Sequence, residues 1–204
     1  LLTLVRMARW GDVLEETAGA GAAEGTPGMF EYARGIALAR TGRVAETGVM
    51  VVSLDERVRT ARTAAKPDDD FAKMMAERLA TLSSQLKAEV AFARGDVDAA
   101  LAAGREAIRA EEAMGGEPPL LAGGSQVALG DLLLRARRYP EAEAAFRADL
   151  ALQPGSGWAL RGLQVAVAAQ NRGAEAQQLR AEWARAWQEA DAALRLAPRS
   201  WTVP

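Results

Sequence analysis

The feature that most constrains the fold is a set of residues spaced as in a helix-turn-helix unit of about 34 residues. Between Gly123 and Pro154 this set comprises Leu129, Gly130, Ala142, Phe146 and Pro154. Gly130 and Ala142 lie twelve positions apart, and because neither carries a bulky side chain, two helices can approach closely there. Phe146 fills the space beneath them, and Pro154, which lacks an N–H, ends the second helix. The stretch therefore predicts a pair of packed helices.

Small residues and turns recur along the rest of the chain. Ala176 lies 34 positions after Ala142, which is one full period. The small residues at Gly35, Ala88 and Gly130 are separated by 53 and 42 positions, so longer helices or inserted loops must take up the excess. The expected units are residues 1–18 in part, 29–63, 69–114, 120–154 and 156–194. We therefore predict one all-α domain over residues 1–204, an α-solenoid of antiparallel helix pairs with a C-terminal capping helix.

Turn and cap residues place the individual helices. Apolar residues recur at helical spacing over residues 29–40 and 71–93, and Asp68-Asp69-Asp70 precedes the second of these segments. These aspartates suit the positive end of a helix, and they lack the spacing and the glycine of a Ca²⁺ loop. The turns are expected at Thr41-Gly42-Arg43, Arg94-Gly95-Asp96 and Asn171-Arg172-Gly173. Residues 19–28 and 115–119, which are rich in Gly or Pro, are expected to be loops.

The last helix is expected to close the solenoid. Its apolar face carries Leu179, Trp183, Trp187, Ala190 and Leu194, with polar residues between them. A terminal helix of a solenoid packs its inner face on the preceding repeat and exposes a polar outer face. Packing is therefore the favoured role of Trp183 and Trp187, and an anchor for a partner is the alternative.

The composition restricts the chemistry that the chain can perform. Cysteine and histidine are absent, which removes thiolate nucleophiles, disulfides, imidazole bases and the usual zinc ligands. The net charge of −2, with both signs interspersed, offers no basic field for nucleic acid. No apolar run approaches the ~18 residues that a membrane helix needs. We expect a soluble protein that is not an enzyme, with no cofactor, metal site, nucleic-acid partner or membrane insertion.

The start of the chain carries no recognisable targeting signal. Residues 1–5 are apolar but lack the charged start and the cleavage site of a signal peptide. Because the first residue is Leu1, we expect the natural protein to extend further upstream. Without cysteine, the sequence does not choose between cytoplasm and periplasm.

The helix-pair motifs resemble the tetratricopeptide repeat (TPR) family, and this resemblance implies that the expected α-solenoid is right-handed. The spacing from Leu129 to Pro154 is similar to the L-G…A-x3-F…P signature, although Gln126 and Leu133 stand where the signature has Trp and Tyr. Nearly the whole chain resembles the carboxy-terminal half of long bacterial TPR proteins of mostly undefined role. The segments that carry this resemblance are Arg9-Trp10…Val13-Leu14, Tyr32-Ala33-Arg34-Gly35, Glu117-Pro118-Pro119, Phe146-Arg147-x-Asp149-Leu150 and Gly157-Trp158-x-Leu160-x-Gly162-Leu163.

The resemblance implies a surface for a partner, because TPR units present fixed positions of their first helices to a concave groove. In this sequence those positions include Val127, Asp131, Leu134, Arg135, Trp158, Arg161 and Val165. The Lys and Asn residues of the chaperone-binding carboxylate clamp are missing. Among the predicted groove residues, only Arg135 and Arg161 therefore support the binding of a peptide carboxylate.

The expected function is a non-catalytic scaffold that binds a protein or peptide in this groove. Two alternatives stay open. In one, the chain is the C-terminal repeat region of a larger enzyme or ligand-binding protein whose active site lies upstream of residue 1. In the other, the repeats form a structural self-association module, so that the chain is a homo-oligomer.

Overall fold

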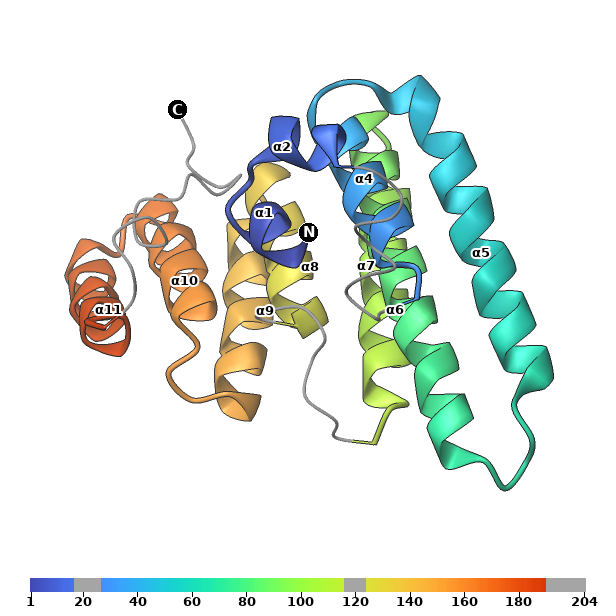
Figure 1. The fold of residues 1–204 in the computed structure, drawn as a ribbon. Coiled ribbons are helices and arrows are strands. Elements are labelled where there is room, and N and C mark those ends of the chain that lie inside the picture. The colour runs from blue at the N-terminus through green and yellow to red at the C-terminus, as the bar shows by residue number, and fades with distance from the viewer. Residues whose placement is uncertain (17–26, 116–123, 190–204) are drawn as a thin grey trace. The chain divides into compact units, whose positions relative to one another are not determined.

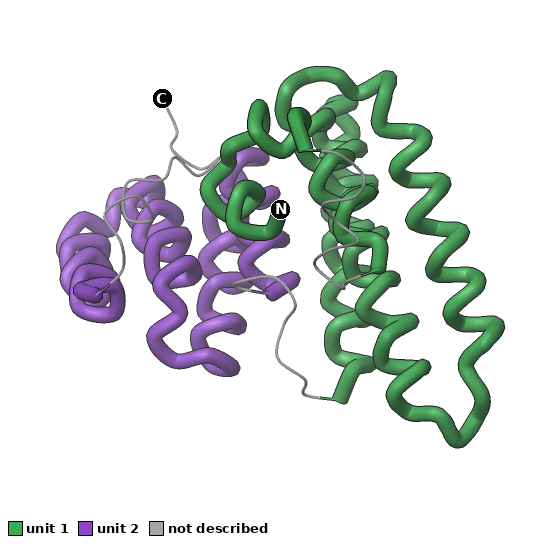
Figure 2. The backbone as a smooth tube through the Cα atoms, in the orientation of Figure 1, with its two compact units in different colours: residues 1–120 green, residues 121–204 purple. Residues whose placement is uncertain are grey.

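The computed structural model describes residues 1–16, 27–115 and 124–189, and these residues form helices without a strand (Figure 1). The all-α prediction is therefore confirmed for the described part of the chain. Two compact units divide the chain, residues 1–120 and residues 121–204 (Figure 2). A single continuous domain and a common solenoid axis stay predictions. Of the expected loops, residues 19–26 and 116–119 lie outside the described residues, as do Ala190 and Leu194 of the expected last helix.

Helix pairs account for both units. In unit 1 the helices are α1 (Leu2–Arg6), α2 (Trp10–Glu15), α4 (Met29–Arg40), the 3-10 helix η1 (Val44–Glu46), α5 (Thr47–Ala64), α6 (Asp70–Ala93) and α7 (Val97–Glu112). In unit 2 they are α8 (Gly124–Arg135), α9 (Tyr139–Leu152), α10 (Gly157–Ala169) and α11 (Gly173–Ala186). Each helix packs mainly on its neighbours in sequence. The predicted bounds of the helix over residues 29–40 are confirmed, and the Asp69 side chain caps α6 by accepting the N–H of Ala72 at 2.9 Å.

Five turns between paired helices share one backbone geometry. Each contains a residue with positive φ, and these residues are Ala8, Gly42, Gly95, Arg137 and Asn171. The N–H of the next residue donates to a carbonyl five positions earlier, with N···O distances of 2.8 to 3.3 Å at Arg9, Arg43, Asp96, Arg138 and Arg172. This is the Schellman arrangement, which satisfies carbonyls that the end of a helix leaves unpaired. The turns are separated by 34, 53, 42 and 34 positions, in agreement with the intervals between the small residues.

The residue after each positive-φ position is the N-cap of the helical segment that follows, and its side chain makes a charged contact there. At four of the five described turns it is an arginine that pairs with an acidic side chain three residues later. These pairs are Arg9–Asp12, Arg43–Glu46, Arg138–Glu141 and Arg172–Glu175. At the fifth turn Asp96 instead caps α7 by accepting the N–H of Ala99 at 3.0 Å. An acidic residue in the first turn suits the positive end of the helix, so each pair helps to fix where the second helix starts.

Phe146 is the centre of the core in unit 2. Its side chain is fully buried, and its ring lies against glycines of two different helices. A Cβ added to Gly130 of α8 would lie 2.6 Å from the ring, and one added to Gly162 of α10 would lie 2.3 Å from it. Ala142, the predicted small partner of Gly130, is also fully buried. The aromatic ring of α9 therefore packs directly on the backbones of the first helices of two successive pairs.

Unit 1 is organised around α4 and α6. The side chain of Leu86 on α6 lies where a Cβ of Gly35 on α4 would be, at 2.6 Å. Polar contacts join the same two helices, because Arg40 pairs with Glu89 at 2.8 Å and Tyr32 donates to Gln85 at 3.1 Å. The apolar stripe of α6 begins later than its sequence pattern suggests. Phe71 is 70 % exposed, because it lies in the first turn of α6, ahead of the first buried residue of this helix.

Gly162 lies against Phe146, whereas a Cβ at Gly48 would lie against no other residue, so Gly→Ala substitutions at these two helical positions should affect stability differently. Gly162→Ala places a methyl group against the buried ring, and we expect a loss of about 1–3 kcal/mol in the free energy of unfolding. Gly48→Ala in α5 meets nothing within 4 Å, so its higher helix propensity should leave stability unchanged or raise it by up to ~1 kcal/mol. Urea unfolding of both variants checks this. An unchanged midpoint for Gly162→Ala would contradict the packing, whereas partial rescue by Phe146→Leu would support it.

Candidate functional site

The structure separates the expected groove residues into two groups. On α8, Val127, Asp131 and Leu134 are buried, and Arg135 is largely covered and pairs with Asp131 at 3.7 Å. On α10, Trp158, Arg161 and Val165 are half-buried and share one side of the helix. Assignment of all seven residues to a groove stays a prediction, and the α10 residues are the ones that leave most surface for a partner.

The α10 residues lie where this helix meets α11. Because a short turn joins the two helices, the start of α10 lies beside the end of α11 (Figure 1). The ring centroids of Trp158 and Trp187 are 4.4 Å apart in an edge-to-face arrangement. Nearer the middle of the pair, the Arg161 guanidinium carbon lies 5.5 Å from the ring centroid of Trp183. Trp183 and Trp187 are neighbours as well, with centroids 5.9 Å apart.

These contacts join Trp158, Arg161, Trp183 and Trp187. Together with Arg180, which lies three positions before Trp183 on α11 and whose charge acts on Arg161, they form a surface that we call the tryptophan–arginine cluster. Its members on α11 are spaced by three and four positions, as are Trp158, Arg161 and Val165 on α10. The two rows therefore run along the facing sides of an antiparallel pair. The favoured packing role of Trp183 and Trp187 agrees with these contacts, although both rings stay partly exposed.

Gly157 makes room for the indole of Trp187. A Cβ added to Gly157 would lie 1.3 Å from the indole nitrogen of Trp187, so the ring occupies the space of the missing side chain. Gly157 is the first residue of α10, directly after the N-cap residue Ser156. Trp187 is the C-cap residue, directly after the last residue of α11. Contact between them therefore fastens the open end of the helix pair.

The cluster carries positive charge without a described carboxylate to balance it. Arg161 is the only charged residue of α10, and its Nη1 donates to the amide oxygen of Gln164 at 2.7 Å. Neither Arg161 nor Arg180 makes an ion pair with any residue in the ranges that the structure describes. Burial, and then the positive charge of Arg180, lower the pKa of Arg161. An arginine nevertheless stays protonated, so the charge persists beside the indoles.

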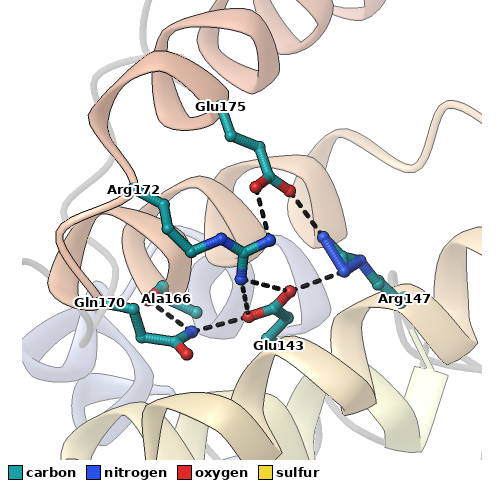
Figure 3. A network of polar contacts seen from close by, with 6 residues as sticks. All are labelled: Glu143, Arg147, Ala166, Gln170, Arg172 and Glu175. Carbon is teal, nitrogen blue, oxygen red and sulfur yellow. Dashed lines mark hydrogen bonds and ion pairs between the residues drawn. The ribbon is translucent and has the colours of Figure 1, made fainter.

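A network of ion pairs fastens the opposite end of the same helix pair (Figure 3). Glu143 of α9 accepts hydrogen bonds from Arg147 at 2.6 Å, from Gln170 at 2.7 Å, and from Arg172 at 2.7 and 2.9 Å. Arg147 and Arg172 also reach Glu175 in the first turn of α11, at 2.7 and 2.5 Å. The network therefore joins α9 to the turn between α10 and α11.

The surroundings of the two acidic residues favour their ionised forms. Burial acts to raise the pKa of Glu143, but hydrogen bonds from Arg172 and Gln170, together with the charges of Arg147 and Arg172, outweigh it and lower the pKa. The hydrogen bond from Arg147 is the largest cause that lowers the pKa of Glu175, and Arg172 adds to it. The network is therefore held together by ionised carboxylates at neutral pH.

Sequence reasoning missed both this network and the contact between Gly157 and Trp187. A signal for part of the network is visible, because Arg138 and Glu141 precede Arg172 and Glu175 by 34 positions and form the same pair. The contribution of Glu143 has no such signal, since it depends on how α9 packs against a turn 27 to 29 residues later. Nothing in the local sequence links Gly157 to Trp187 either.

Comparison of the chain with protein-family models, curated proteins and solved structures gives no match. Membership of the TPR family therefore stays a prediction that rests on the residues and the helix pairs. Over the residues that the structure describes, none of the helices is long and apolar enough to span a membrane. The same residues include no group of three or more acidic side chains placed to hold a metal ion.

The network predicts a specific loss of stability in acid. The pKa of Glu143 lies below the usual value of 4.5, so its contribution is present above that pH and is lost as the pH falls through the lowered pKa. We expect Glu143→Gln to cost about 1 kcal/mol at neutral pH, because the arginines are nearly half exposed and screened by water. As the pH falls below 4.5, the difference between the variant and the wild type should shrink, and it should vanish once the pH is below the lowered pKa. Urea midpoints between neutral and acid pH test this.

A matched control is Glu56→Gln, which removes the exposed Arg59–Glu56 pair. We expect almost no change in its midpoint at neutral pH and a pH dependence like that of the wild type. If Glu143→Gln kept its full difference from the wild type in acid, the assigned role of Glu143 would be wrong.

Gly157 and Gly173 give a direct test of the ring arrangement, since each is the first residue of its helix. Gly157→Ala displaces Trp187 from Trp158, so the near-ultraviolet circular dichroism of the coupled indoles should weaken while the helical far-ultraviolet signal is kept. Gly173→Ala, which meets nothing within 4 Å, should leave both signals unchanged. An unchanged near-ultraviolet spectrum for Gly157→Ala would contradict the described contact.

Proposed function

We propose that this chain is a TPR-like repeat protein that binds a protein or peptide and performs no chemistry of its own. Five turns of one geometry, with two intervals of 34 positions, support a repeated helix pair as the structural unit. Packing of Phe146 on Gly130 and Gly162 supports the same repeat in unit 2, because one aromatic residue serves two successive pairs. Repeat proteins of this type use their side-chain surface for binding.

The tryptophan–arginine cluster is the observation that carries the proposal. Tryptophan and arginine are the residues most enriched where a few side chains supply most of the binding energy. Here three indoles and Arg161 contact one another on one pair of helices, with the charge of Arg180 close by, and all five side chains keep some exposure. Because the rings already contact one another, a partner would order few new side-chain torsions on binding.

The proposed surface combines the half-buried groove residues of α10 with residues of α11 that the sequence did not assign to a groove. Trp158, Arg161 and Val165 come from the first helix of the last pair. Arg180 and Trp183 come from its second helix and extend the surface from α10 onto α11. We propose that a partner contacts both helices, with Arg161 near the centre.

Selection from a random peptide library displayed on phage, with the full chain immobilised, tests the proposed function. We expect the wild type to enrich related sequences, and the synthetic peptides to lose at least about tenfold in affinity for Trp183→Ala and for Arg161→Glu, which is ~1.4 kcal/mol. Trp10→Ala, which removes an indole from unit 1, is the matched control and should bind as the wild type does. Far-ultraviolet circular dichroism confirms that each variant keeps its helices.

Two outcomes would overturn this proposal. One is that no peptide enriched on the wild type binds it in solution. The other is that folded Trp183→Ala and Arg161→Glu variants bind the selected peptides as tightly as the wild type and the Trp10→Ala control.

A further inference from the structure

We propose that the tryptophan–arginine cluster binds an acidic peptide segment, with Arg161 and Arg180 contacting a carboxylate and the indoles contacting an aromatic side chain beside it. This inference rests on the proposed function and specifies the chemistry of the partner. It names Arg180, Trp183 and Trp187 on the second helix of the pair as contributors to the same site as Trp158 and Arg161.

Charge is the first step of the argument. A half-buried cation is costly unless a negative group compensates it. On one end of the α10–α11 pair, Arg147 and Arg172 are saturated by Glu143 and Glu175 (Figure 3). In the cluster, Arg161 has an amide oxygen as its hydrogen-bond partner, and the nearby charge is that of another arginine. In the described part of unit 2, carboxylates therefore neutralise Arg147 and Arg172 but not Arg161 and Arg180. This leaves an excess positive charge at the cluster.

The orientation of Arg161 is the second step. Its guanidinium group is held by the hydrogen bond from Nη1 to Gln164 and by the ring of Trp183 at 5.5 Å. In the described residues its Nε and Nη2 make no hydrogen bond, so donors remain for a carboxylate. An arginine fixed beside an aromatic ring is already oriented to donate two parallel hydrogen bonds. A carboxylate is the planar anion of peptides that matches this pair of donors.

The indoles provide the third step, because they distinguish a peptide from a small anion. Inorganic phosphate would bind to the arginines and would make no contact with the three indole rings. The ring of Trp187 lies 4.4 Å from that of Trp158 and 5.9 Å from that of Trp183, measured between centroids, and all three rings are partly exposed. An aromatic side chain packs favourably on the edge or face of such rings. A segment with acidic and aromatic residues side by side fits the whole cluster, whereas a basic segment is repelled by both arginines.

Fluorescence polarisation with the full chain and three labelled peptides tests this inference. The probe is Gly-Ser-Glu-Phe-Glu-Ser-Gly, and its analogues carry Gln in place of both Glu residues or Ala in place of Phe. We expect the probe to bind at least about tenfold more tightly than either analogue. Arg161→Gln should remove the preference for Glu over Gln, and added salt should weaken binding of the probe. Arg59→Gln, an exposed site on α5, is the matched control and should keep the preference.

Each contrary result has a separate meaning. Equal binding of the Glu and Gln peptides, or a preference that survives in Arg161→Gln, overturns the acidic specificity even if peptides selected from the phage library bind. Competition by inorganic phosphate as effective as that by unlabelled probe shows that the cluster binds simple anions, which also overturns the inference. Sedimentation that shows a dimer broken by Arg161→Gln assigns the cluster to a second copy of the chain instead. Failure of every selected peptide overturns the proposed function itself.

Discussion

The backbone hydrogen bonds at the five turns are the interactions on which the helix pairs depend. A helix that simply stops leaves its last carbonyls unpaired, and burying such an end would be costly. In each turn the N–H after the positive-φ residue returns to a carbonyl of the preceding helix, so the chain reverses with few residues and few unpaired groups. Glycine occupies two of the five positions, whereas Ala8, Arg137 and Asn171 adopt the same conformation despite their side chains. The geometry is thus maintained by hydrogen bonding and helix packing, because three of the five residues gain nothing from glycine's freedom.

Much of the fold could be predicted because its determinants are local. Helix α4 has the predicted bounds, and Asp69 caps α6 as its position before an apolar stripe indicates. The intervals of 53 and 42 positions between small residues could also be read from the sequence. Each small residue lies the same number of positions before the turn of its own helix pair, so the turns follow the same intervals. Phe146 could be paired with Gly130 because the spacing of one repeat fixes that contact.

Features that depend on contacts between successive helix pairs could not be predicted from the sequence in the same way. Gly162 meets the ring of Phe146 from the next pair, and Glu143 meets a turn that follows it by 27 to 29 positions. Burial of Val127 and Leu134 is a further example, because helical spacing places them on one side of α8 without specifying what covers that side. Phe71 shows the opposite error, since its spacing fits the stripe but its position in the first turn leaves it exposed. The candidate site could therefore be predicted only in part. Its α10 residues followed from the repeat, Trp183 and Trp187 were assigned to packing with a partner anchor as the alternative, and Arg180 and the contacts between the two helices required the structure.

The distribution of arginines in unit 2 gives the helix pair two different ends. At the turn between α10 and α11, Arg147 and Arg172 share the carboxylates of Glu143 and Glu175, so their charges contribute to holding the pair on α9. At the open end, Trp187 fills the space above Gly157 and fastens the helices without using charge. Because hydrophobic packing contributes to securing that end, the charges of Arg161 and Arg180 are not used there in ion pairs between the described residues of the two helices, and the remaining donors of Arg161 can serve a ligand. A helix pair that is fixed at both ends also changes little when a partner binds, which keeps the entropic cost of recognition low.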